Sequence, residues 1–204
     1  MQITAIEPRK KGLSALYIDG EFAMKLDTEV LLAHRFDVGR EIDDEALHDC
    51  VLDSQLKRCK DKAMWLISYR DHSRRELFDK LKKDYPEDVA EAAVTRMEEL
   101  GLINDASYAR RYTADLINVK HLSERGIRQK LYEKGIDRDL IDEILNETEL
   151  DEAQQIRAVI EKKYARGLDD EKIRRRAVNA LQRLGFGYGS IKSVLNEYTD
   201  IEEY

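Results

Sequence analysis

The sequence predicts a mostly α-helical protein: a tandem array of three three-helix repeats with a small N-terminal β-hairpin segment. Three observations support this fold. The 204 residues include 38% charged residues and only two prolines, which is rich in helix formers and poor in helix breakers. Apolar residues follow the 3.6-residue helical period, which argues against disorder despite the high charge. One helical pattern also recurs twice, at a constant offset of 50 residues.

The first 26 residues differ from the rest because their polar and apolar side chains alternate, as strands do. Apolar residues cover Leu13–Ile18, and alternation resumes over Glu21–Leu26. Asp19-Gly20 lies between these runs and suits a type I′ turn, in which both central residues have positive φ. We expect an antiparallel sheet of two or three strands. A helix capped by Asp27 or Thr28, and continuing through Phe36, should cover it.

The repeat is clearest in its middle helix. In the first copy Ser73 is the expected N-cap, Glu76 can complete a capping box, and Leu77 and Leu81 form the apolar face. The equivalent positions are Ser123, Ile127 and Leu131 in the second copy, and Ile173, Ala177 and Leu181 in the third. An apolar helix precedes each middle helix and a short helix follows it. Any helical bundle repeats some leucines, but the constant offset favours a true repeat.

A single unit of this size buries too little apolar surface to be stable alone. Neighbouring units are therefore expected to stack or share a core. We divide the chain into an N-terminal segment of β-hairpin and helices (1–59) and three-helix repeats at 60–105, 106–150 and 151–204.

The motifs of several enzyme and cofactor-binding classes do not occur. The sequence lacks a Gly-x-x-x-x-Gly-Lys phosphate loop, a Gly-x-Gly-x-x-Gly fingerprint after a strand, and a His-x-x-x-His pair. The glycine-rich run Gly185–Gly189 is interpreted as a helix C-cap and hinge with an aromatic staple. Cys50 and Cys59 lie nine residues apart in one predicted helix, which indicates free thiols in a reducing compartment. We expect a cytoplasmic protein that is no enzyme and holds no cofactor or metal.

Two further features of the sequence are candidate sites. His72 and His121 each lie just before a middle helix, which indicates a role in the turn, and for His72 a pH-sensitive contact is the alternative. Arg110 and Arg111 stand beside Tyr108 and Tyr112 and would form a base-stacking platform if these tyrosines were exposed. We expect the tyrosines to be core residues instead.

The basic residues are the strongest functional candidates, although the net charge is −7. Arg75, Arg125 and Arg175 occupy the same repeat position, which core packing does not require. Each guanidinium can bind a phosphate or a partner carboxylate in bidentate fashion. The alternative is that each pairs with an acidic residue of its own repeat. The full set of partner-binding or DNA-binding candidates is Arg74, Arg75, Lys82, Lys83, Arg110, Arg111, Arg125, Arg128, Lys130, Lys134, Arg174, Arg175 and Arg176.

The sequence from about residue 60 to 198 resembles the RecX family. The resemblance is carried by Tyr69–Leu77 with Leu81, Val94, Met97, Leu100–Asp105, Tyr108–Tyr112, Gly126–Leu131, Lys134–Ile136, Leu184–Phe186 and Ile191. The segment that joins the first and second repeats is the most specific part. The N-terminal sixty residues resemble the longer members, which add a β-hairpin segment.

The resemblance implies a curved, elongated helical array that lies in the groove of a RecA filament on single-stranded DNA. Such proteins inhibit RecA's ATP hydrolysis and strand exchange, and so regulate homologous recombination, DNA repair and the SOS response. We expect a monomer whose partner is the RecA filament, with no membrane. This chain departs from the more basic members in its negative charge, so direct contact with single-stranded or duplex DNA is left open.

A second hypothesis is a helical DNA-binding regulator that acts without RecA and uses Ser123–Leu131 as a recognition helix. It predicts a compact dimer whose DNA binding falls steeply as salt rises. An enzyme would require a buried polar cluster in a pocket, and the sequence offers none.

Overall fold

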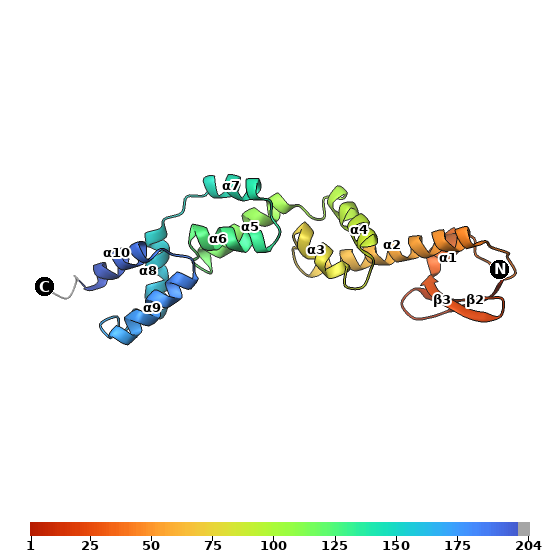
Figure 1. Ribbon diagram of the computed structural model, residues 1–204, viewed down its shortest axis with the longest axis horizontal. Coiled ribbons are helices and arrows are strands. Elements are labelled where there is room, and N and C mark those ends of the chain that lie inside the picture. Colours follow the sequence, from red (N-terminus) through yellow and green to blue (C-terminus); the bar gives the residue numbers. More distant parts are fainter. Residues whose placement is uncertain (200–204) are drawn as a thin grey trace. The chain divides into compact units, whose positions relative to one another are not determined.

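The computed structural model describes residues 1–199, which form three strands and ten helices (Figure 1). The chain divides into two compact units, Met1–Ile103 and the part from Asn104 onward. The first unit contains β1 (Ile3–Pro8), β2 (Leu13–Ile18), β3 (Glu21–Asp27), α1 (Thr28–Ala33), α2 (Asp44–Tyr69), α3 (Arg74–Leu81) and α4 (Glu87–Glu99). The second contains α5 (Asp105–Asn118), α6 (Glu124–Glu133), α7 (Arg138–Asn146), α8 (Glu152–Lys163), α9 (Glu171–Arg183) and α10 (Tyr188–Thr199). The predicted mostly helical fold is confirmed.

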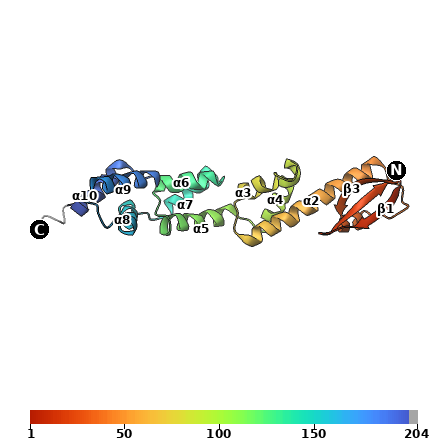
Figure 2. The ribbon, with the colours of Figure 1, turned by 90° about the horizontal axis from the view of Figure 1, so that it is seen from below.

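The N-terminal sheet has three antiparallel strands in the order β1-β2-β3. Asp19 and Gly20 join β2 to β3 with φ values of 50° and 88°, as the predicted type I′ turn requires. Ile3, Leu16 and Leu26 form the buried side of the sheet together with side chains from α1 and the start of α2. Figure 2 shows the strands beside the N-terminal half of α2. The sheet is therefore stabilised by helix packing, as expected for so small a unit.

Helix α1 is shorter than the sequence predicted. Asp27 is the N-cap, and its carboxylate accepts hydrogen bonds from the backbone N–H groups of Glu29 and Val30 at 3.0 and 3.3 Å. The helix ends at Ala33 because Arg35 adopts a positive φ of 55°, which no α-helix accommodates. Phe36, predicted inside the helix, lies beyond its end but is still buried against the sheet.

Helix α2 is one helix of 26 residues that serves both the N-terminal segment and the first repeat. Its first half covers the sheet and its second half packs against α3 and α4 through Cys59 and Ala63. Cys50 and Cys59 are free and buried, and burial raises the pKa of each thiol to about 11. Within residues 1–199, α2 and every other helix are too short or too polar to cross a membrane.

The repeat register predicted for the middle helices is confirmed. The paired apolar positions in α3, α6 and α9 have no exposed surface: Leu77 and Leu81, Ile127 and Leu131, Ala177 and Leu181. Ser73 and Ser123 are N-caps, each accepting a hydrogen bond from the backbone N–H three residues later at 3.1 Å. The third copy differs, because α9 begins after Asp170, nearly one turn before the position aligned with those serines.

Repeats two and three are joined by a close contact between the start of α6 and the end of α9. The backbone N–H and the hydroxyl of Ser123 both donate to the carbonyl oxygen of Leu184, each at 3.2 Å. A Cβ on Gly126 would lie 2.4 Å from that oxygen, and a Cβ on Gly185 would lie 2.4 Å from the Ser123 hydroxyl. Leu184 packs against the cores of both repeats. The expected stacking of neighbouring repeats is thus achieved here, at a distance that only glycine permits.

Candidate partner-binding surface

Three arginines of the middle helices point away from the cores. Arg75, Arg125 and Arg175 each precede a fully buried position by two residues, about 200° around the helix, and all three are exposed. The Arg75 side chain is 69% exposed and lies 3.8 Å from Asp79, a separation too long for a strong ion pair. Arg125 and Arg175 make no ion pair with any other residue of 1–199.

Other candidate arginines are engaged within their own repeats. Arg74 pairs with Glu91 and Glu98 of α4. Arg110 reaches α7, where Glu143 and Glu147 lie at 2.6 and 3.3 Å. A hydrogen bond to Glu91 raises the pKa of Arg74, and one to Glu147 raises the pKa of Arg110. These arginines tie the first or middle helix of a repeat to its third helix.

Arg128 behaves in the same way. It pairs with Asp142 of α7 and with Glu124 one turn earlier in α6, and the hydrogen bond to Asp142 raises its pKa. Pairing within the repeat, the alternative considered from the sequence, therefore holds for Arg74, Arg110 and Arg128. It does not hold for Arg125 and Arg175 among the residues that the structure describes.

The remaining candidates divide between short local contacts and open surface. Lys82 lies 3.0 Å from Asp79, Lys130 lies 2.7 Å from Glu133, Arg111 donates to Ser107 at 2.7 Å, and Arg174 donates to Asn196 at 3.2 Å. The Lys134 ammonium lies 5.7 Å from the centroid of the Tyr112 ring. Lys83 and Arg176 are exposed and form no ion pair with other residues of 1–199.

Tyr108 and Tyr112 form no base-stacking platform. Tyr108 is buried, and Tyr112 packs on the same core with its ring centroid 5.7 Å from that of Tyr108. Two lysine ammonium groups, from Lys120 and Lys134, cover the Tyr112 ring. The prediction that these tyrosines are core residues is confirmed.

A hollow on the second repeat contains residues that sequence reasoning missed. It has a volume of about 510 Å³ and lies between α6 and α7, and its lining includes Arg125, Arg128, Arg138, Tyr132 and Asp142, the partner of Arg128. The Tyr132 side chain is 70% exposed. Its position directly after the buried Leu131 could have indicated this, because neighbours on a helix face different sides. Forked guanidinium groups beside an exposed ring suit carboxylate, phosphate or aromatic groups of a partner.

His72 takes a structural position. It is only 4% exposed, and its Nδ1 lies 2.8 Å from the carbonyl oxygen of Arg70. Burial lowers its pKa. His121 has a positive φ of 53° at the equivalent turn, and its Nδ1 lies 3.0 Å from the amide oxygen of Gln155. Both histidines shape the turn before a middle helix, and no group of three or more potential metal ligands occurs in the described part of the chain.

Comparison with known proteins matches all three repeats. The models for the first, second and third three-helix domains of RecX match residues 59–97, 104–145 and 150–195. The regulatory protein RecX of Clostridioides difficile is 30% identical over 99% of this chain and 98% of its own length. That of Bacillus velezensis is 28% identical over 98% of this chain and 78% of its own.

Solved structures agree with this match. A crystal structure of regulatory protein RecX superimposes with a TM-score of 0.65 at 26% identity, covering 96% of this chain and 98% of the other. RecX from Lactobacillus salivarius gives 0.57 at 26% identity, over 70% of this chain and 96% of its own.

Proposed function

Because the chain belongs to the RecX family of regulatory proteins, we propose that it binds filaments of the RecA recombinase and inhibits their ATP hydrolysis and strand exchange. It acts in the cytoplasm as a monomer, by occupying the filament surface, and needs no cofactor and no reaction of its own. Its effect is therefore on homologous recombination, DNA repair and the SOS response.

One observation about the surface supports docking through the middle helices. Elsewhere in this acidic protein, arginines such as Arg74 and Arg110 are neutralised by carboxylates of the same repeat. Arg125 and Arg175 occupy equivalent exposed positions in repeats two and three, and neither forms an ion pair with a carboxylate among residues 1–199. An exposed, unpaired guanidinium adds little to stability, but it can pair with a carboxylate or phosphate of a partner at little desolvation cost.

We assign Arg75, Arg125 and Arg175 to the contact with the filament, with Arg138 and Tyr132 beside Arg125. Arg174, Arg176 and Lys83 extend the same surfaces. We place Arg74, Arg110 and Arg128 in a supporting role, since each already pairs with a carboxylate of its own repeat, whereas Arg125 and Arg175 have no such partner within residues 1–199.

The test is RecA-dependent ATP hydrolysis on single-stranded DNA with substoichiometric amounts of this protein. Inhibition is expected with the parent chain and should weaken in R75A/R125A/R175A. The control K10A/K25A/K192A removes the same number of exposed cations outside the proposed surface and should inhibit like the parent. Equal inhibition by the arginine variant would refute the assignment of these arginines. A parent chain that leaves ATP hydrolysis unchanged would refute the proposed function.

The alternative, a regulator that acts on DNA alone, places α6 in a DNA groove. A recognition helix presents its N-terminal residues to base edges. In this chain the N-terminal turn of α6 packs against repeat three, because Ser123 binds the carbonyl oxygen of Leu184 and Gly126 lies against it. This packing argues against that use of α6. A regulator that acts on DNA alone must cover the DNA, so inhibition of ATP hydrolysis at amounts too small to do so would favour binding to RecA.

A further inference from the structure

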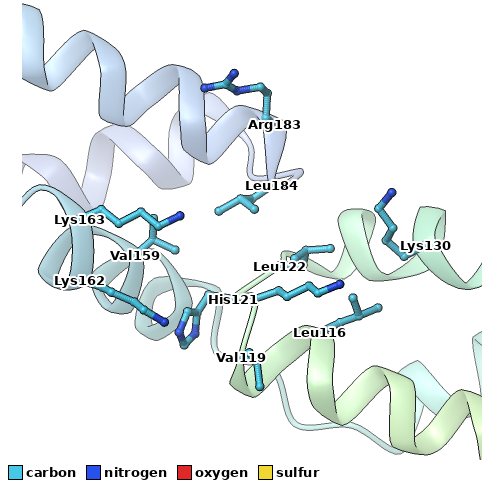
Figure 3. Close-up of a pocket in the computed structure, with 11 residues that line it drawn as sticks. Leu116, Val119, His121, Leu122, Lys130, Val159, Lys162, Lys163, Arg183 and Leu184 are labelled. Carbon is cyan, nitrogen blue, oxygen red and sulfur yellow. The ribbon is translucent and has the colours of Figure 1, made fainter. Parts of the chain in front are cut away.

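A second basic surface lies where repeats two and three meet. A groove of about 410 Å³ opens between the α5–α6 turn and the helices α8 and α9 (Figure 3). Its floor is apolar and is made by Leu116, Leu122, Val159 and Leu184. Five cations line it as well: Lys120, Lys130, Lys162, Lys163 and Arg183. Figure 3 shows Lys162 and Lys163 extending from α8 on one side and Lys130 on α6 on the other, with Leu184 between them.

The positive charge of this groove is largely uncompensated. None of the described residues that line the groove carries a carboxylate. Within residues 1–199, Lys162, Lys163 and Arg183 take part in no ion pair. Lys120 lies 5.8 Å from the Tyr112 ring centroid, and Lys130 lies 2.7 Å from Glu133, the one acid that pairs with a lining cation in the described part of the chain. Such a concentration is unexpected in a chain with 42 acidic and 35 basic residues. Charges of one sign that line the same cleft attract ligands of the opposite sign.

The walls of the groove are fixed by the contacts that join the two repeats. Ser123 holds the carbonyl oxygen of Leu184, and Gly126 and Gly185 bring the backbones too close for any larger residue. Two residues before Ser123, the Nδ1 of His121 lies 3.0 Å from the amide oxygen of Gln155 in α8. The groove therefore has a preformed shape, which reduces the entropy lost when a ligand binds.

We propose that this groove binds an acidic peptide segment of a partner protein, with an aliphatic side chain on the floor and carboxylates on the cationic rim. The apolar floor favours a peptide over a nucleic acid. A phosphodiester backbone would meet the lysines but place no apolar group on Leu122, Val159 and Leu184. Among the described lining residues, the His121 imidazole is the one aromatic ring, and its Nδ1 lies 3.0 Å from the amide oxygen of Gln155, so no Tyr, Trp or Phe is present there to stack a nucleobase. This binding stands apart from the proposed function, because it can be measured without a recombinase.

The test uses a fluorescein-labelled peptide of alternating Glu and Leu, titrated with the full chain and followed by fluorescence anisotropy. Binding is expected, and K162E/K163E should weaken it about tenfold or more, because two attractive contacts become repulsive. The control K172E/K192E makes the same change of charge on exposed lysines of repeat three outside the groove. It should bind the peptide like the parent.

Two comparison ligands decide the chemistry. A peptide with Ser in place of every Leu should bind more weakly, because it leaves the apolar floor uncovered. Single-stranded oligothymidylate should lose no more affinity in K162E/K163E than in K172E/K192E. Equal binding of the Glu-Leu peptide by both variants would overturn the proposal. So would equal binding of the Ser peptide, or oligothymidylate affinity that depends specifically on Lys162 and Lys163. Circular dichroism of each variant checks that the helices are intact.

Discussion

Replacing Gly126 by alanine tests how the second and third repeats are joined. The new Cβ would lie 2.4 Å from the carbonyl oxygen of Leu184, so the backbones must move apart by about an ångström. Overpacking of this kind costs about 1–3 kcal/mol. Loss of the hydrogen bonds from Ser123 to Leu184 adds about 1 kcal/mol. The higher helix propensity of alanine returns about 1 kcal/mol. We expect a net loss of about 1–3 kcal/mol in the free energy of unfolding.

Gly189 provides the matched control. It also lies in the first turn of a helix, and a Cβ there would meet no atom within 4 Å. Gly189→Ala should therefore leave stability unchanged or raise it slightly. Urea unfolding followed by circular dichroism measures both variants, and hydrogen exchange at the backbone amides of Ser123 and Gly126 shows whether the junction opens. If G126A is as stable as G189A, and these amides stay protected, the close contact between the repeats is not as described.

Three further predictions concern buried groups and the second repeat. Cys50 and Cys59 should react with a thiol reagent only slowly in the native protein and quickly in urea, because burial raises the pKa of both thiols to about 11; fast native labelling would contradict their burial. The pKa of His72 is lowered by burial, so the unfolded chain binds a proton that the folded chain resists. Stability should fall as the pH drops through about 6.5, and His72→Gln should flatten this dependence in urea titrations between about pH 7.5 and 5.5. An unchanged slope would exclude His72 as its source. Tyr132→Ala should leave the unfolding free energy within about 0.5 kcal/mol of the parent, since the ring is largely exposed; a larger loss in urea unfolding would show that it packs.

Local signals predicted the repeats well. The middle helices were found because Leu77, Ile127 and Ala177 occupy equivalent buried positions at a fixed offset, and burial imposes that spacing. The type I′ turn at Asp19-Gly20 was equally predictable, since few residue pairs tolerate positive φ twice. The ends of the helices were harder to predict from the sequence. Helix α1 stops before Phe36 because of the backbone conformation at Arg35, which no pattern in the sequence indicates.

The surface was harder to predict because its contacts join distant residues. Arg110 and Glu147 are 37 positions apart, and nothing local shows that they pair across α5 and α7. The same holds for the groove, whose lining comes from 116–130 in one repeat and 159–184 in the next. Lys162-Lys163 is visible in the sequence as a basic cluster, but only the fold places it opposite Lys130. The boundaries at 60, 106 and 151 stay predictions.

The most direct test of the proposed function is the binding of this chain, labelled with a fluorophore, to RecA filaments assembled on single-stranded DNA. The same titration is made with the bare DNA at the same salt concentration, because salt alone changes the affinity of any protein for DNA. We predict saturable binding to the filament at concentrations where the bare strand is still free. Equal affinity for the bare strand and for the filament would contradict a regulator whose partner is RecA.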